Sequence, residues 1–324
     1  MKRRAFHLLL AGLATAASLA ASPALAAWPD KPITIVVPYA PGGTADALAR
    51  LIGQYLGPKL NTSVVVVNKA GASGVIGEAS VAQAPADGYT VLYDATPLSI
   101  NPHLVAKMPF DPQKDLAPVT LVAVTPMLVT VNKNSPYNSL QDMIKAGKAA
   151  PGKITFGSGG QGTVQYMAAE LFNQATGMKM LHVAYKSGGP ALAAALAGEI
   201  DTGFANLPAV SSQVKSGLLK PLAITSAQRH PLYPDVPTIA EVAVKGYESY
   251  EWNGMFLPAN TPADIVNKLN AAIREVLANP EVKAKFDGLG SRIVGSSPDE
   301  FRKYLATDYT KWATTVKAAG IQKE

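Results

Sequence analysis

Cysteine is missing from the whole chain of 324 residues. Its absence excludes a thiol nucleophile, a cysteine metal site, a disulfide framework and a lipid anchor on an N-terminal cysteine. Without covalent cross-links the protein depends on its core, and 48% of its residues are hydrophobic. The length is enough for two domains of ordinary size or one large one.

Clustered positive charge is also missing. The formal net charge is +6, but three of the basic residues, Lys2, Arg3 and Arg4, stand at the very start of the chain. The other lysines and arginines are spread along the sequence, whereas a nucleic-acid-binding surface needs a basic stripe. We therefore expect no nucleic-acid partner.

Catalytic patterns are scarce as well. The sequence has no H-E-x-x-H and no G-x-S-x-G, and His103, His182 and His230 show no partner spacing. Each of these histidines is interpreted as a surface or hydrogen-bonded structural residue. Because no nucleophile–base pair is present, the sequence favours a binding protein over an enzyme, with no cofactor and no metal.

The first 26 residues have the pattern of a secretory signal peptide. "MKRR" is basic, "HLLLAGLATAASLAA" is apolar or small, and "SPALA" predicts cleavage after Ala26 or Ala27. The apolar stretch is short and rich in alanine for a membrane span, although an uncleaved anchor stays open as an alternative. "RRAF" leaves both Sec and twin-arginine export open. We expect a periplasmic protein with no later membrane span.

From residue 30 onward, short β-branched runs alternate with helical segments, and the runs are almost continuously apolar. This pattern predicts parallel sheets covered by helices on both faces, as in doubly wound α/β layers. The predicted strands are 33–37, 63–67, 90–93, 127–131, 153–156, 181–185, 200–204 and 220–225. The predicted helices are 44–57, 74–84, 139–148, 163–176, 188–198 and 262–278.

Two proline-rich segments, 101–118 and 229–238, interrupt the alternation. The last seventy residues are largely helical and too few to form a domain of their own. We therefore expect them to pack on the α/β segment that precedes residue 101. The sequence therefore predicts two lobes, 27–126 plus 252–324 and 127–251. Two crossings, near 124–130 and 248–256, would join the lobes and leave a cleft between them.

Each predicted lobe has one glycine-rich turn between a strand and a helix, "PYAPGGTAD" (38–46) and "GSGGQGT" (157–163). A helix start leaves backbone N–H groups unpaired and carries partial positive charge. Glycines let an anionic ligand approach these groups without a Cβ in the way. The alternative is that both are tight turns with ordinary helix caps.

A nucleotide site fits these turns poorly. Gly157, Gly159 and Gly162 match G-x-G-x-x-G, but the sequence has no acidic residue between Glu170 and Glu199 to bind a ribose. The first turn has no lysine after its glycines, so it is not a P-loop. An anion site for a smaller solute is favoured.

Further motifs follow in order along the chain: "WPDKPITIVVPYAPGGTAD", "VVVVNKAGASGVIG", "ADGYTVLY", "INPHL", "FDPQKDLAPV", "GSGGQGT", "VAYKSGGPA", "GEIDTGFANLP", "VPTIAEV" and "WNGMFLPANTP". Together they resemble the solute receptors of tripartite tricarboxylate transporters, also called Bug receptors, over essentially the whole mature chain. The resemblance implies a type II periplasmic binding protein fold with a hinged cleft. It also implies a small organic carboxylate as ligand, integral membrane transporter subunits as partners, and a monomer.

The resemblance also implies a set of ligand-binding residues, with the second glycine of the first turn and the threonine after it as donors to a carboxylate. Asp46 needs care, because its charge repels an anion; its expected role is to cap the first helix, with an ordered water as a further option. The implied set is Tyr39, Gly43, Thr44, Asp46, Asp94 and Thr96 from lobe 1, and Ser158, Gly160, Gly162, Thr163, Tyr185 and Asn206 from lobe 2.

Two positions depart from the family pattern. The family often has histidine where Tyr166 stands, and we expect Tyr166 to keep a polar edge near the helix start. The family often has a small uncharged residue near Asp94, whose charge disfavours a fully charged dicarboxylate. Asp94 either meets an amine, a ring nitrogen or a hydroxyl of the ligand, or points away from it.

Three functions remain after these observations. The first is an exported receptor that delivers a carboxylate to a membrane transporter, and the second is a sensory receptor with the same cleft. The protein sequence does not separate these two. The third, a periplasmic enzyme, needs a catalytic group in the cleft that the sequence does not provide.

Overall fold

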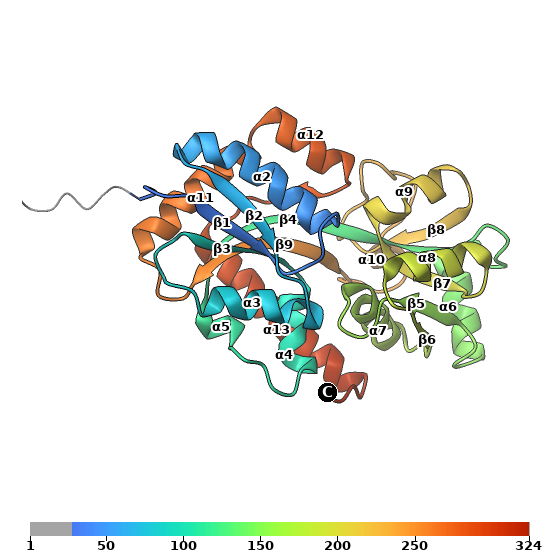
Figure 1. The fold of residues 1–324 in the computed structure, drawn as a ribbon. Helices are drawn as coiled ribbons and strands as arrows, with labels where there is room; N and C mark the ends of the chain where they lie inside the picture. Colours follow the sequence, from blue (N-terminus) through green and yellow to red (C-terminus); the bar gives the residue numbers. More distant parts are fainter. Residues whose placement is uncertain (1–27, 324) are drawn as a thin grey trace, which may run out of the picture.

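The computed structural model describes residues 28–323. The signal peptide predicted for residues 1–26, with cleavage after Ala26 or Ala27, lies outside the described residues. A sheet of ten strands runs through the described part, with helices on both faces and two lobes side by side (Figure 1). None of the described helices is long and apolar enough to cross a membrane.

In lobe 1, three parallel strands lie in the order β2-β1-β3, and β9 continues the sheet in the antiparallel direction. These strands are β1 (Ile33–Val37), β2 (Val64–Asn68), β3 (Thr90–Ala95) and β9 (Tyr250–Pro258), and the short β10 (Arg292–Ile293) pairs with the long β4 (Leu116–Asn132). The helices are α2 (Thr44–Leu60), α3 (Val75–Ala82), α4 (Pro97–Leu104), α5 (Pro112–Asp115), α11 (Ala263–Leu277), α12 (Pro280–Gly288) and α13 (Pro298–Ala318).

Lobe 2 repeats this plan with parallel strands in the order β6-β5-β7, followed by β4 and then β8 in antiparallel pairings. Its strands are β5 (Thr155–Ser158), β6 (Leu181–Ala184), β7 (Thr202–Asn206) and β8 (Leu219–Ile224). Its helices are α6 (Leu140–Ala149), α7 (Val164–Thr176), α8 (Gly188–Ala197), α9 (Leu207–Lys215) and α10 (Ile239–Val242).

Two long strands make the crossings. β4 has 17 residues, and it pairs with β9 from Leu116 to Pro126 and with β7 from Met127 onward. The predicted strand 127–131 is therefore only the last part of β4. Pro118 lies beside an irregularity in the register, which explains how a residue without an N–H fits this strand. The predicted lobe boundaries, 126/127 and 251/252, fall inside β4 and β9 and stay a prediction.

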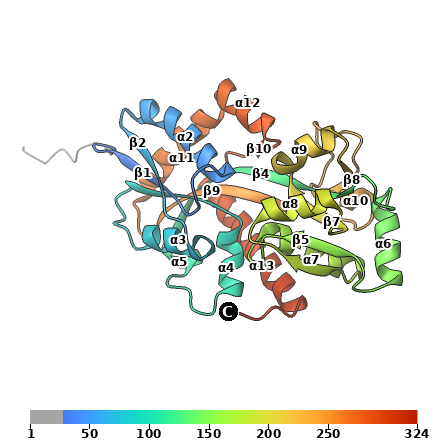
Figure 2. The same ribbon diagram turned by 45° about the vertical axis from the view of Figure 1, so that its right-hand side comes forward.

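The C-terminal helix α13 contacts both lobes. Near its start, Phe301 packs 5.8 Å from Trp252 and 5.0 Å from Phe256, measured between ring centroids, in lobe 1. Near its end, Trp312 and Val316 lie in the core of lobe 2. A helix of 21 residues is about 31 Å long, enough to reach from one lobe to the other (Figure 2). The expected packing on the α/β segment that precedes residue 101 therefore describes only part of α13.

A buried carboxylate marks the place where α13 passes the crossings. Asp308 Oδ2 accepts hydrogen bonds from Trp252 Nε1 at 2.8 Å and from Trp312 Nε1 at 2.9 Å. Ser99 Oγ of α4 donates to the same oxygen at 2.6 Å. This carboxylate therefore joins α13 to β9 and α4.

Candidate ligand-binding site

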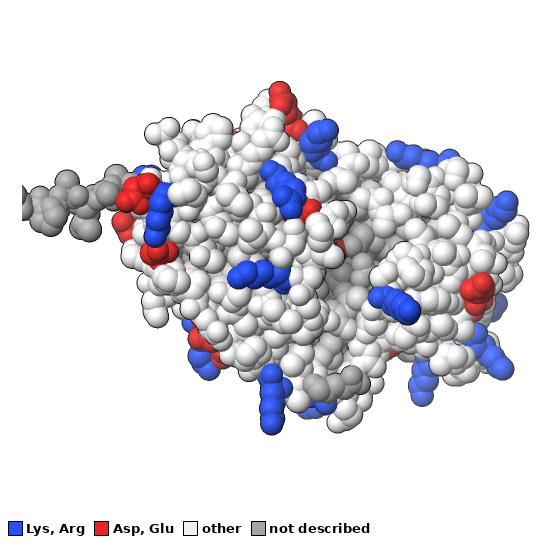
Figure 3. All heavy atoms as spheres, in the orientation of Figure 1, with Lys and Arg blue, Asp and Glu red and all other residues white. Residues whose placement is uncertain are grey.

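A cleft lies between the two lobes (Figure 3). The carboxyl ends of β1 and β3 in lobe 1 and of β5, β6 and β7 in lobe 2 lead into helices that begin at this cleft, where open α/β sheets bind ligands. The lobes approach closely at Gly162: a Cβ placed there would lie 3.8 Å from Ser73 Oγ and 3.9 Å from Asn101 Oδ1. The turn before α7 therefore faces lobe 1 across the cleft.

The two glycines of the β1–α2 turn differ in what the backbone requires of them. Gly42 has φ +87°, a conformation that favours glycine. Gly43, the N-cap of α2, has φ −78° and ψ 170°, which any residue can adopt. A Cβ at Gly43 would meet only Ala40 O, at 3.9 Å. Neither the backbone conformation nor the packing requires a glycine at Gly43, and its lack of a side chain leaves the exposed start of α2, where Thr44 stands, open.

Asp46 holds this turn in shape. Its carboxylate accepts hydrogen bonds from the backbone N–H of Gly42 at 2.9 Å and from Asn68 Nδ2 at 3.0 Å, and it pairs with Arg50. The hydrogen bond from Arg50 and that from Gly42 lower the pKa of Asp46 to about 2. Both carboxylate oxygens are engaged. The geometry therefore supports a role of Asp46 in holding the turn rather than in contacting a ligand.

The hydroxyl groups of Ser158 and Thr163 in the β5–α7 turn form hydrogen bonds with neighbouring residues of the protein. Ser158 Oγ lies 2.8 Å from His182 Nε2 and accepts a hydrogen bond from the N–H of Gly160 at 3.2 Å. Thr163 Oγ1 donates to the carbonyl oxygen of Gly160 at 2.7 Å and accepts from the N–H of Tyr166 at 3.3 Å, which makes Thr163 the N-cap of α7. The N–H groups of Val164 and Gln165, the first two residues of α7, are left to serve as donors.

Tyr166 lies in the first turn of α7 with its ring packed inside lobe 2. Its ring lies 4.6 Å from the ring of His182 and 5.9 Å from that of Phe156, in the core of lobe 2. Burial raises its pKa to about 12. The backbone N–H of Tyr166 donates to Thr163, while its ring packs against the rings of Phe156 and His182.

Thr96 and Tyr185 each make a hydrogen bond with a backbone group of a neighbouring segment. The hydroxyl of Thr96, which is fully buried, accepts a hydrogen bond from the backbone N–H of Trp252 at 2.9 Å, so Thr96 ties α4 to β9. The N–H of Tyr185 donates to the carbonyl oxygen of Ser158 at 2.9 Å, and the Tyr185 ring covers Gly157. Thr96 thus supports the crossing, while Tyr185 is half-buried beside the β5–α7 turn.

We use the name cleft floor for four residues: Tyr39 of the β1–α2 turn, Asp94 of β3, Asn206 of β7 and Glu251 of β9. Tyr39 OH donates to Asp94 Oδ1 at 2.7 Å, and Asn206 Nδ2 donates to Glu251 Oε2. Burial raises the pKa of Glu251 to about 7. Burial also raises the pKa of Tyr39 well above its ordinary value, and the nearby carboxylates add to this effect.

Asp94 has a buried carboxyl neighbour that the sequence did not predict. Glu78 of α3 lies within hydrogen-bonding reach of Asp94, and burial raises the pKa of both groups. Two adjacent carboxyls are stable only when one of them carries a proton. The side chain of Asp94 is fully buried and accepts a hydrogen bond from Tyr39, and both interpretations of Asp94 stay predictions.

The segment 71–74 also reaches the cleft and was not predicted as part of the site. Ala72 and Ser73 have φ of 47° and 54°, uncommon for residues with a side chain, and Asn101 Nδ2 donates to the carbonyl oxygen of Ser73 at 3.1 Å. The quoted motif "KAGASGVIG" contains this segment, so its repeated glycines were the available signal.

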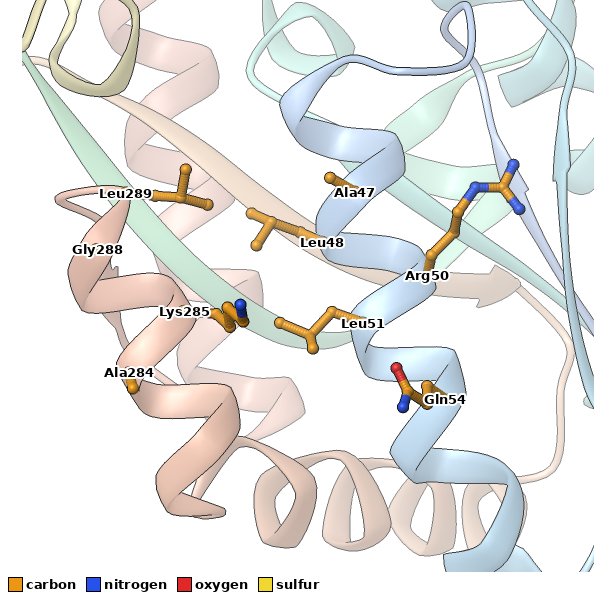
Figure 4. Close-up of a pocket in the computed structure, with 9 residues that line it drawn as sticks. All are labelled: Ala47, Leu48, Arg50, Leu51, Gln54, Ala284, Lys285, Gly288 and Leu289. Atoms are coloured by element: carbon orange, nitrogen blue, oxygen red, sulfur yellow. The ribbon is translucent and has the colours of Figure 1, made fainter. Parts of the chain in front are cut away.

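A second hollow lies outside the cleft, between α2 and α12. It is a mainly apolar groove of about 740 Å³, with Leu48, Leu51 and Leu289 on its walls and Arg50 and Lys285 beside them (Figure 4). The groove contains none of the predicted ligand-binding residues.

The chain is similar to known receptors over most of its length. Residues 48–321 match the family model described as "Tripartite tricarboxylate transporter family receptor". The structure of the periplasmic binding protein BugD is 31% identical, with a TM-score of 0.78, over 92% of this chain and 100% of that chain. The Rhodopseudomonas palustris protein Rpa4515, solved with adipate, is 34% identical with a TM-score of 0.81, over 92% and 100%.

MatC of Rhodopseudomonas palustris, solved with bound malate, is 28% identical with a TM-score of 0.77, over 89% of this chain and 100% of that chain. These similarities confirm the predicted periplasmic binding protein fold of two α/β lobes and the predicted solute-binding class. The chain therefore belongs to the tripartite tricarboxylate transporter receptor family, whose members are binding receptors rather than enzymes.

Proposed function

We propose that this chain is a periplasmic receptor that captures a small organic carboxylate in the cleft and delivers it to the membrane subunits of a tripartite tricarboxylate-type transporter. Family membership supports the transporter as partner. The adipate and malate in the structures of two relatives support a carboxylate as ligand. The signal-peptide pattern of residues 1–26 supports export to the periplasm.

The observation that carries this proposal is the open start of α2, with Gly43 at its N-cap, on one wall of the cleft and the start of α7 on the other. Each hydrogen bond to a charged group contributes about 1.5–3 kcal/mol, and a helix start adds about 0.3–1 kcal/mol. Four or five such contacts would exceed the ordering costs and give micromolar binding, about 8 kcal/mol. A carboxylate can therefore be held without a lysine or an arginine.

The residues divide by role in this proposal. Those with open backbone or polar edges at the cleft contact the ligand, while those whose polar atoms are engaged hold the turns and the crossing in shape. The proposed contacts are Tyr39, Gly43, Thr44, Gly160, Gly162, Tyr185 and Asn206; the proposed supporting residues are Asp46, Asp94, Thr96, Ser158 and Thr163.

A thermal-shift screen of the mature protein over mono-, di- and aromatic carboxylates tests the proposal. We expect at least one carboxylate to raise the melting temperature, and calorimetric titration of Gly43→Val to show weaker binding of that compound. The proposal is wrong if no carboxylate shifts the melting temperature. It is also wrong if Gly43→Val binds the compound as the wild type does.

A further inference from the structure

The four residues of the cleft floor include no positive side chain. Asp94 is fully buried and Glu251 is partly buried, and within residues 28–323 no lysine, arginine or histidine forms an ion pair with either carboxyl. Each of these carboxyls repels an anionic solute whenever it is ionised. Arg50 pairs with Asp46, so the positive charge beside the first glycine turn is largely offset. An attraction that acts on a distant anion therefore has to come from another part of the cleft.

Lobe 1 has an exposed lysine at the carboxyl end of β2. This strand is parallel to β1, with Asn68 opposite Val37, and the backbone N–H of Lys69 donates to the carbonyl oxygen of Val37 at 2.9 Å. Lys69 therefore lies at the end of the sheet where β1 leads into the first glycine turn. Its ammonium group lies 3.3 Å from Ser80 Oγ and forms no ion pair within residues 28–323.

Lobe 2 has an exposed lysine just after β6. This strand is parallel to β5, and the backbone N–H of Tyr185 donates to the carbonyl oxygen of Ser158 at 2.9 Å. The chain then passes close to the second glycine turn, because a Cβ placed at Gly159 would lie 3.0 Å from Ser187 Cα. Lys186 stands between Tyr185 and Ser187, is exposed, and forms no ion pair in the described part of the chain.

The two lysines occupy matching positions in two matching sheets, and we call Lys69 and Lys186 the rim lysines. The parallel strands run in the order β2-β1-β3 in lobe 1 and β6-β5-β7 in lobe 2, so β2 and β6 correspond to each other. Lys69 is one residue past the end of β2, and Lys186 is two residues past the end of β6. Basic side chains accordingly stand on both sides of the cleft (Figure 3).

We propose that the rim lysines attract the anionic solute toward the cleft from a distance and do not contact it in the bound state. This rests on the proposed function, because the attraction needs a negatively charged solute. Charges of one sign on the walls of a cleft focus the field and raise the rate at which an oppositely charged ligand enters. Since one rim lysine belongs to each lobe, their potentials add between the lobes, where the solute has to enter.

Calorimetric titration of the mature protein at two salt concentrations tests the proposal. The probe is the carboxylate among acetate, succinate, malate, adipate and benzoate that raises the melting temperature most. The Debye length is about 30 Å at 0.01 M salt and about 3 Å at 1 M, so an attraction over a distance acts only at the lower concentration.

At 0.01 M salt we expect Lys69→Gln and Lys186→Gln each to raise the Kd about threefold, and the double variant about tenfold. At 1 M salt all three should bind the probe as the wild type does. Stopped-flow measurement of intrinsic fluorescence should locate the loss in the association rate rather than in the dissociation rate. Lys186→Arg keeps the charge and should bind as the wild type does at both concentrations.

Lys179→Gln is the matched control. Lys179 is exposed and stands two residues before β6, at the opposite end of the strand that Lys186 follows. The substitution removes the same charge from the same edge of the sheet but away from the glycine turn. It should leave the Kd unchanged at both salt concentrations.

The proposal is overturned if the rim variants bind as the wild type does at 0.01 M salt, or if Lys179→Gln has the same effect as Lys186→Gln. A loss that persists at 1 M salt also overturns it, because such a loss indicates direct contact with the bound solute. Failure of the proposed function looks different: no carboxylate shifts the melting temperature, and both proposals are then wrong. If Gly43→Val weakens binding at both concentrations while the rim variants have no effect, the receptor function stands and only the attraction by the rim lysines is wrong.

Discussion

The carboxylate of Asp46 accepts a hydrogen bond from the backbone N–H of Gly42, 2.9 Å away and four residues earlier. Arg50, four residues later, pairs with the same carboxylate. The first turn of α2 thus fastens the loop that leads into it. The shape of the exposed helix start therefore depends on the charge of one buried side chain.

This relationship predicts a pH dependence of stability. The pKa of Asp46 is about 2 in the folded protein, below its ordinary value of 3.8. A carboxyl with a lowered pKa adds stability above its unfolded pKa, and that contribution is lost as the pH falls from about 4 to about 2. Urea unfolding should show that Asp46→Asn lowers the stability at neutral pH and flattens this acid loss. Asp264→Asn, an exposed acidic residue in the first turn of α11, should do neither.

The second prediction concerns Gly43. Valine at this position keeps an allowed backbone conformation but places a branched side chain at the open start of α2. We expect Gly43→Val to weaken binding of the solute by about tenfold or more, with the melting temperature of the empty protein nearly unchanged. Ala47→Val, on an exposed position of the same helix, is the control. Thr44→Ala should cost less, because only one hydroxyl is lost.

Gly160 gives a contrasting third prediction. Its φ of +112° strains any other residue, so Gly160→Val should lower the stability of the empty protein by about 1–3 kcal/mol in addition to weakening binding. Urea unfolding and calorimetric titration of the same sample separate the two effects. If Gly160→Val unfolds like the wild type, the turn is more adaptable than its backbone angles indicate.

Ligand binding should close the two lobes, because each wall of the cleft holds only half of the proposed contacts. Small-angle X-ray scattering of the mature protein should give a smaller radius of gyration with saturating solute. An identical scattering profile with and without solute would count against hinge closure. The same data at increasing protein concentration test the expected monomer.

The mature protein should lack its first 26 or 27 residues. Mass spectrometry of a periplasmic extract from the expressing bacterium measures the N-terminus directly. A chain beginning at Met1 and recovered with the membrane fraction would instead support the uncleaved anchor.

The strands and helices that follow a regular pattern could be predicted from the sequence, and those that contain proline could not. β1 was predicted with the bounds Ile33–Val37 that the structure has, since it is a short apolar run before a glycine turn. Most of β4 was not predicted because it contains Pro118 and Pro126, and α4 was not predicted because it contains Pro102. Proline normally ends such elements. A register irregularity lies beside Pro118, and Pro102 stands inside a helix of only eight residues.

The turns of the candidate site could be predicted because each is a local pattern of glycine and hydroxyl residues. The contact between Glu78 and Asp94 could not, because it depends on how α3 packs beside the end of β3. The pairing of Asn206 with Glu251 depends on the crossing of β9 in the same way. No local pattern in the sequence specifies such contacts between distant segments.

The carboxylate of Asp308, held by the indoles of Trp252 and Trp312, gives the protein an optical property of its own. These are two of the three tryptophans in the chain, and both lie where α13 passes from one lobe to the other. Indole emission shifts with the electric field of a nearby charge, so a change in the angle between the lobes would alter two emitters at once. Solute uptake should therefore be visible in the intrinsic fluorescence of the unlabelled protein, in real time and at low concentration.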